Sequence, residues 1–416
     1  MDTPAATPKT EIGPQKGWTI VGLLSASIGV NLIDRQALSV MAPVIREALK
    51  LSPSQYGYIT ASFQTGMLVG QVPAGSFMDS VGTRTGLAVI LLLWSLINAG
   101  HAFAAGLGAL LALRFFMGLM ECGNYTAGIK AIAGMFPAER RSSAGGVFNA
   151  GAQLGSVLAA PLIVYIAANY GWRAGFLIPS LAGLIWLVPW LTIFPKTQFQ
   201  PRQKQSQTSS VRLSQLMRNR KVVGLFLIRV CSGPLTTFYW FWLPEYLRSG
   251  RKMSFASIGA LAWLPYLFGA LGNVLGGILS DRLARSGRSL DSARKIGFGC
   301  AFALSALSMT LPLAGSDFIA LAIVSAVLFG NQWVAATYIA TVGDVVPHTL
   351  AGRVNGLAGF GDSAATLLAT LLTGIVVERF SYTPVFLAAG CLPVLAMLSV
   401  LFVLRRIEPA RIETAA

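Results

Sequence analysis

Charge and histidine are scarce in this sequence. Of its 416 residues only 12% are charged and two are histidines, whereas 54% are hydrophobic. Soluble domains typically carry about twice that share of charged residues, so the composition excludes an ordinary soluble domain. The two histidines, His101 and His348, do not form a His-Glu-x-x-His pattern, and Gly-x-Ser and Cys/His nucleophile patterns are also missing. An intramembrane enzyme is therefore disfavoured.

Cysteine is rare as well. The four cysteines all lie in apolar runs without metal-ligand spacing, namely Cys122, Cys231, Cys300 and Cys391. We expect them to pack as small side chains and to form neither disulfides nor a metal site. Residues 1–17 lack an apolar stretch with a small-residue cleavage site, so we expect no cleaved signal peptide. The net charge of +16 fits the basic loops of a membrane protein, and no nucleic-acid partner is expected.

Long apolar runs dominate the rest of the chain. Windows of roughly 20 apolar residues can each cross about 30 Å of hydrocarbon as a helix. The sequence predicts an all-α membrane protein with twelve such spans, at 18–43, 55–78, 85–104, 107–134, 142–168, 172–194, 221–247, 255–280, 294–314, 317–343, 352–377 and 382–404.

The polar, basic segment 196–220 reads as a flexible linker between two six-helix halves, 18–195 and 221–404. Tails at 1–17 and 405–416 flank these halves. Lys and Arg are most abundant on the side that carries both ends of the chain, which predicts that both termini are cytoplasmic.

The two halves repeat each other. The motif that begins at Gly75 after the second span, Gly-Ser-Phe-Met-Asp, recurs at Gly277 after the eighth as Gly-Ile-Leu-Ser-Asp. Parallel six-helix repeats around a site near the membrane midplane are a transporter architecture. We expect four charged residues of these loops to latch the closed state rather than to contact substrate: Asp79, Arg84, Asp281 and Arg282.

Five charges within the spans are the main functional signal: Asp34, Arg35, Arg114, Glu121 and Arg229. A charge near the bilayer centre costs several kcal/mol, so each should face a partner or a water-filled cavity. At 1.5 Å per residue, Asp34 and Arg114 lie roughly 12 Å and 10 Å from the outer surface, which makes an ion pair plausible. Glu121 lies two turns beyond Arg114 on the same helix face, so it is the other candidate partner.

These charges suggest a transport chemistry. An arginine holds a carboxylate through two parallel hydrogen bonds, so Arg35 and Arg229 on opposite halves are predicted to clamp an organic anion. Burial disfavours a charged carboxylate and a nearby arginine favours it. Asp34 and Glu121 are therefore predicted to bind and release protons as the conformation changes, while Arg114 has an ion-pairing or gating role.

Further polar and aromatic side chains are candidates for the pocket wall. The polar candidates are Gln64, Asn149, Gln153, Asn331, Gln332 and Asn355. The candidate rings are Tyr239, Trp240, Trp263 and Trp333. Any one of the polar residues can instead form a helix–helix hydrogen bond, and Trp and Tyr near span ends often anchor at the membrane interface.

The loop Gly-x-x-x-Asp-x-x-Gly-x-Arg that ends at Arg84 resembles the signature of the major facilitator superfamily. The pair Asp34-Arg35 and the stretch 114–121, Arg-Phe-Phe-Met-Gly-Leu-Met-Glu, resemble its anion:cation symporter family, which includes bacterial galactonate and hexuronate transporters, sialin and the vesicular glutamate transporters. The resemblance covers nearly the whole chain. It implies that Arg35 and Asn355 contact substrate and that Asp34 and Glu121 couple protons.

Some pocket positions depart from the family pattern. Met67 replaces a tyrosine of galactonate-type relatives, Gly233 precedes Pro234 where hexuronate-like relatives have aspartate, Asn331 replaces a histidine, and Asp362 adds a carboxylate to a Gly-rich span. The leading hypothesis is a monomeric proton symporter, free of cofactor and metal, that imports a sugar acid such as a hexuronate or aldonate across the bacterial inner membrane. An aromatic or short aliphatic carboxylate as substrate, and an exporter or uniporter, remain alternatives.

Overall fold

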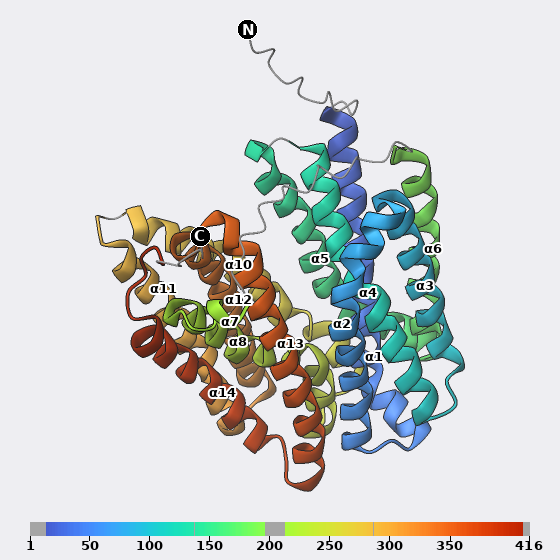
Figure 1. Cartoon of the computed structure of the whole chain (residues 1–416). Helices are drawn as coiled ribbons and strands as arrows, with labels where there is room; N and C mark the ends of the chain where they lie inside the picture. Colours follow the sequence, from blue (N-terminus) through green and yellow to red (C-terminus); the bar gives the residue numbers. More distant parts are fainter. Residues whose placement is uncertain (1–13, 137, 196–212, 286, 411–416) are drawn as a thin grey trace.

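A computed structural model describes residues 14–136, 138–195, 213–285 and 287–410 as a helical bundle (Figure 1). The first half comprises α1 (Pro14–Leu49), α2 (Pro53–Val81), α3 (Thr83–Gly100), α4 (Leu107–Met135), α5 (Ala138–Tyr170) and α6 (Ala174–Ile193). The second comprises α7 (Leu213–Leu216), α8 (Arg220–Glu245), α9 (Phe255–Leu261), α10 (Leu264–Arg285), α11 (Leu290–Ala306), α12 (Asp317–Val345), α13 (His348–Arg379) and α14 (Thr383–Leu398). Residues 196–212 of the expected linker lie outside the described ranges.

Eleven segments of the described chain are long and apolar enough to cross a membrane. They match eleven of the predicted spans, and α9 with α10 forms one of them. The remaining predicted span is α2, which is long enough at 29 residues but carries Gln64, Thr65 and Gln71 in its interior. It packs along α4 and α13, and Gln64 and Thr65 are half-buried there. Gln71 is exposed, and its amide donates to the Ser363 hydroxyl of α13 at 3.4 Å.

The same pairing of helices recurs in both halves. In the first half α1 packs along α5, α2 along α4, and α3 along α6. In the second half α8 packs along α13, α10 along α12, and α11 along α14, which is the same order. Close approach needs a glycine at Gly151, because a Cβ there would lie 1.9 Å from the carbonyl oxygen of Ser25 on α1. The repeat predicted from the loop motifs is therefore present throughout the helix packing.

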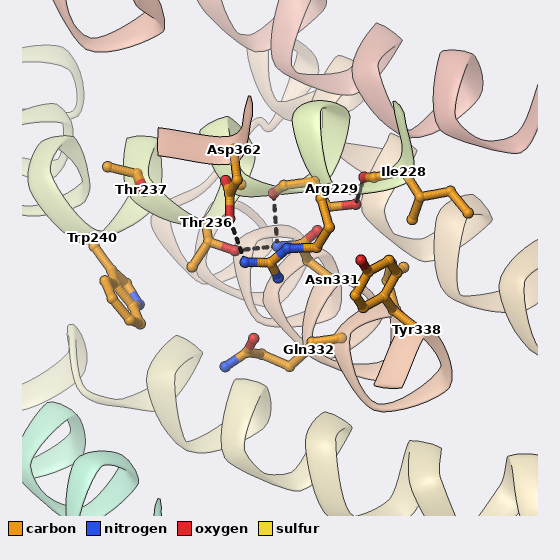
Figure 2. Close-up of a pocket in the computed structure, with 13 residues that line it drawn as sticks. Ile228, Arg229, Thr236, Thr237, Trp240, Asn331, Gln332, Tyr338 and Asp362 are labelled. Atoms are coloured by element: carbon orange, nitrogen blue, oxygen red, sulfur yellow. Dashed lines mark hydrogen bonds and ion pairs between the residues drawn. The ribbon is translucent and has the colours of Figure 1, made fainter. Parts of the chain in front are cut away.

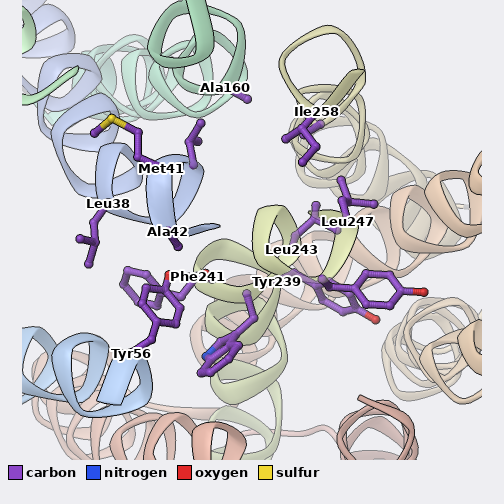
Figure 3. Packing of buried hydrophobic residues seen from close by; sticks show 14 of the residues in the cluster. Leu38, Met41, Ala42, Tyr56, Ala160, Tyr239, Phe241, Leu243, Leu247 and Ile258 are labelled. Carbon is purple, nitrogen blue, oxygen red and sulfur yellow. Dashed lines mark hydrogen bonds between the residues drawn. The ribbon is translucent and has the colours of Figure 1, made fainter. Parts of the chain in front are cut away.

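We call the side at which α1 begins the tail side and the side at which it ends the loop side. Toward the loop side, one hydrophobic cluster joins the halves through α1, α2 and α8 (Figure 3). The Tyr56 hydroxyl donates to the Phe241 carbonyl at 2.6 Å, and the Ser39 hydroxyl lies 2.8 Å from the Trp240 carbonyl. At Gly57 a Cβ would lie 3.0 Å from the Cα of Gly374. The halves are thus closely packed toward the loop side.

Charged groups add to this closure. Arg46 of α1 forms an ion pair with Glu245 of α8, whose side chain is fully buried. The Glu378 carboxylate accepts from the Ser54 backbone N–H at 2.8 Å and from the Ser52 hydroxyl at 2.9 Å. Any motion that opens the loop side has to break these contacts between the halves.

Candidate functional site

An ion pair between α1 and α4 lies at the centre of the first half. The Arg35 guanidinium approaches the Glu121 carboxylate at 2.9 Å from Nη2 and 3.0 Å from Nε. Arg35 Nη2 also donates to Asn31 Oδ1 at 3.3 Å, and its guanidinium lies 5.1 Å from the centroid of the Phe63 ring. The Glu121 side chain is fully buried, whereas that of Arg35 keeps 16% of its surface exposed. Arg35 is therefore the member of the pair that a ligand can reach.

The predicted ion pair between Asp34 and Arg114 is not formed. The Arg114 guanidinium donates instead to the Arg35 carbonyl at 3.4 Å, and it makes no ion pair within the described chain. Asp34 Oδ1 accepts from the Asn98 side-chain amide at 2.8 Å, and the same amide lies 3.1 Å from the Ser180 hydroxyl. Neighbouring residues of a helix point about 100° apart, so with Arg35 turned toward α4, Asp34 turns toward α3 and α6.

The second half carries its own ion pair. Arg229 of α8 donates through Nη2 to Asp362 of α13. The side chains keep 33% and 16% of their surface exposed, so this pair is more accessible than the pair in the first half. Asp362 reaches α8 over Gly233, where a Cβ would lie 1.3 Å from its Oδ1 atom. The Arg229 guanidinium also lies 5.6 Å from the centroid of the Tyr338 ring.

This second pair borders a cavity of about 240 Å³ (Figure 2). Side chains of α8, α12 and α13 line it: Ile228, Arg229, Ser232, Thr236, Thr237, Trp240, Asn331, Gln332, Val334, Ala335, Tyr338 and Asp362, together with Gly233. Trp240, Thr236 and Gln332 also border a smaller hollow of about 10 Å³, which Gln153 and Ser156 of α5 line from the first half. The cavity therefore adjoins the interface between the two halves.

Five of the residues predicted for the site line the cavity: Arg229, Trp240, Asn331, Gln332 and the additional candidate Asp362. Gln153 lines only the smaller hollow. The Asn331 amide donates to the Thr236 hydroxyl, which fixes the amide at the cavity wall. Gln64 is half-buried in α2 and lies at neither the cavity nor the smaller hollow.

Four other predicted pocket residues do not line the cavity. The Tyr239 hydroxyl lies 2.8 Å from the Ser308 hydroxyl in the core of the second half, whereas the neighbouring candidate Trp240 lines the cavity. The Trp333 indole donates to Ser280 at 3.1 Å. Asn149 is exposed, donates to a carbonyl of its own helix and lies one turn before Gln153 on the same face of α5. Asn355 is exposed and lies two turns before Asp362 on the same face of α13, but it does not line the cavity. For Tyr239 and Trp333 the rotation of the helix, which composition does not fix, decides where the side chain points, whereas Asn149 and Asn355 differ from the cavity residues in their position along the helix.

Of the four residues predicted to latch the closed state, Asp79 and Arg84 bond within the first half here. Asp79 pairs with Lys130, and Arg84 donates to the Phe194 carbonyl at 3.1 Å, which ties α3 to the end of α6. Arg282 is exposed. The side chain of Asp281 lies outside the described residues.

Three contributors to the site were not predicted. Asn98 orients Asp34, Tyr338 faces Arg229, and Glu245 pairs with Arg46 on the loop side. A single asparagine in an otherwise apolar span was a usable signal, because a buried amide needs partners. Tyr338 and Glu245 lie near span ends, where polar residues are common and carry little information.

The arrangement suits the recognition of an anion. Each half places one arginine on a buried or half-buried carboxylate, and the first half adds the buried Arg114. A guanidinium has five N–H donors, so Arg35 and Arg229 can each bind a ligand carboxylate once their own carboxylate partner is neutralised. The amides and hydroxyls of Asn331, Gln332 and Thr236 supply neutral hydrogen-bonding groups beside the second arginine.

The sequence pattern of the Major Facilitator Superfamily matches residues 24–290 and 225–416. A hexuronate transporter of Bacillus subtilis (strain 168) is 30% identical over 403 residues, which cover 92% of this chain and 94% of that protein. A hexuronate transporter of Escherichia coli (strain K12) is 28% identical over 419 residues, which cover 96% of each.

A solved structure with the same fold is the crystal structure of a D-xylose-proton symporter. It superposes with a TM-score of 0.75 at 17% sequence identity, over 94% of this chain and 99% of that chain. At this identity the likeness bears on the fold alone. It confirms the predicted fold class, an all-α membrane protein of two six-helix halves.

Proposed function

The chain belongs to the major facilitator superfamily of membrane transporters, and we propose that it is a proton-coupled symporter that imports an organic anion by alternating access. The observation that carries the proposal is the buried pair of Arg35 and Glu121. While Glu121 is ionised it holds the Arg35 guanidinium. A proton on Glu121 releases that guanidinium for the carboxylate of a substrate, so proton and anion bind together.

Asp34 is proposed as a second proton carrier. Its side chain is fully buried, and one of its oxygens accepts from Asn98. A buried carboxylate gains or loses its proton when the helices around it move, because both its hydration and its charged neighbours change. The proton gradient then drives transport without a cofactor.

The proposed substrate is a sugar acid such as a hexuronate or aldonate. The similarity to two hexuronate transporters supports it. The cavity wall supports it too, because Asn331, Gln332 and Thr236 offer donors and acceptors to sugar hydroxyls beside Arg229. The rings of Trp240 and Tyr338 also line the cavity, which favours an aromatic carboxylate as the second candidate.

The proposed location is the bacterial inner membrane, with the tail side cytoplasmic and the protein acting as a monomer. The excess of Lys and Arg on that side supports the orientation. Inward release of substrate then occurs at the tail side, while the loop-side contacts around Arg46 and Glu245 keep the outer side closed.

The test uses purified protein in liposomes that contain a pH-sensitive dye. The acids are added one at a time: galacturonate, glucuronate, galactonate, a benzoate-type acid and a short-chain acid. Only acids of the class that the protein transports should acidify the lumen. Glu121→Gln should remove that acidification. Glu408→Gln should keep it, because Glu408 is an exposed residue that pairs with Lys221. Entry of labelled acid without proton movement would contradict symport and leave a uniporter or exchanger.

A further inference from the structure

We propose that Asp362 competes with the carboxylate of the substrate for Arg229, so that an anion occupies the second half only when Asp362 takes up a proton. This inference rests on the proposed function and adds a proton site in the second half to those in the first. The substrate class concerned is a carboxylate small enough to enter the cavity of about 240 Å³.

Arg229 and Asp362 lie together at the wall of the cavity. Arg229 and Asp362 form an ion pair and both line the cavity, as Figure 2 shows. Arg229 keeps 33% of its side-chain surface exposed, so a ligand can reach it. The ligand then meets Asp362 at the same guanidinium, and the two carboxylates share one cation.

The charges around Asp362 balance before a ligand binds. The ionisable groups that face Asp362 are Arg229 of α8 and Tyr338 of α12, while α2 approaches α13 with the uncharged Gln71, whose amide donates to Ser363 at 3.4 Å. One guanidinium balances one carboxylate. A second carboxylate in this half-buried place leaves an uncompensated negative charge, which is strongly disfavoured unless one of the two is protonated.

The Asp362 side chain fits against α8 at Gly233. A Cβ at Gly233 would lie 1.3 Å from Asp362 Oδ1, so the carboxylate fills the space of a side chain at 233. The Thr366 hydroxyl lies 3.5 Å from the same oxygen. An aspartate at 233 opposite a glycine at 362 would therefore put a carboxylate in nearly the same place beside Arg229. Exchanging the two residues should keep the function of the pair.

The experiment measures proton uptake on anion binding. Purified full-length protein in weakly buffered detergent is titrated with D-galacturonate, and an indicator dye reports the protons taken up per anion bound. Asp362→Asn should take up about one proton fewer per anion than the wild type. Each proton taken up with the anion makes the affinity rise about tenfold for each pH unit toward acid, so the variant should lose one such tenfold rise per pH unit. Glu408→Gln is the matched control, since its carboxylate is exposed and does not line the cavity, and it should match the wild type.

A second pair of variants covers the case in which Asp362→Asn fails to fold. Gly233→Asp alone crowds two carboxylates and should lose binding. The double variant Gly233→Asp/Asp362→Gly should restore both affinity, to within about threefold, and the proton count. Wild-type proton uptake in Asp362→Asn, or no rescue in the double variant, overturns the role of Asp362 alone. A wild type that binds galacturonate without any proton uptake overturns the proposed function as well.

Discussion

The two arginine–carboxylate pairs differ in burial and in the residues that surround them. Glu121 is fully buried, and its partner Arg35 is held by Asn31 and faces the Phe63 ring. Arg229 and Asp362 are both partly exposed and line a cavity. A buried pair is costly to break and responds sharply to a proton, whereas an accessible pair exchanges partners more readily. On the proposed function, we therefore expect coupling mainly in the first half and substrate selection mainly in the second.

The largest effect is expected from Arg35→Ala. Removing one partner of a buried, hydrogen-bonded charge pair costs about 2–5 kcal/mol, so anion affinity should fall by more than about 30-fold and uptake should stop. Calorimetric titration with galacturonate measures the affinity, and Arg229→Ala provides the comparison, with a smaller loss expected at the more accessible pair. Near-normal affinity in Arg35→Ala would remove Arg35 from the binding site.

Glu121→Gln should separate binding from coupling. Glutamine keeps the shape of the side chain but cannot exchange a proton, so Arg35 stays available to the anion while proton-driven accumulation ends. Counterflow of labelled substrate in liposomes should persist, and accumulation under an imposed pH gradient should vanish. If accumulation persists, the coupling role moves to Asp34 or Asp362.

Asn98→Ala tests how much the hydrogen bond from α3 to Asp34, the neighbour of Arg35 on α1, contributes to stability. The variant leaves the buried Asp34 carboxylate without its amide donor, which should lower the free energy of unfolding by about 1–3 kcal/mol. Thermal unfolding in detergent reports the loss, and Asn169→Ala, an exposed asparagine on α5, is the control. Unchanged stability would mean that Asp34 does not need this hydrogen bond.

The smallest effect is expected at the second pair from Tyr338→Ala. A cation–π contact at a partly exposed site contributes about 0.5–1 kcal/mol, which corresponds to roughly a two- to fivefold loss of affinity for the anion. Tyr338→Phe keeps the ring beneath Arg229 and should stay close to the wild type. A large loss in Tyr338→Phe would instead assign the hydroxyl to the substrate.

Sequence reasoning reached the fold and the identity of the main charges. The spans followed from apolar length, and the repeat followed from the loops at Gly75 and Gly277, because both features are local in the chain. Arg35, Glu121 and Arg229 stood out because a charge in an apolar run needs a partner. The positions of Tyr239, Trp333 and the other side chains of the pocket wall could not be read in this way.

Several interactions arise only when distant segments meet. Arg35 rather than Asp34 faces Glu121, since a rotation of about 100° per residue separates neighbours on α1. Asp362 reaches Arg229 because Gly233 leaves room on a helix more than a hundred residues earlier in the chain. Arg46 meets Glu245 because the two halves close against each other on the loop side.

By itself, the sequence determined that this chain crosses the membrane many times, that its halves repeat and that its buried charges turn inward. Those outcomes depend on the cost of placing residues in hydrocarbon, which composition and length already fix. Tertiary structure decided which charge pairs with which and which ring faces the cavity, because these depend on the rotation and closeness of helices from distant parts of the chain.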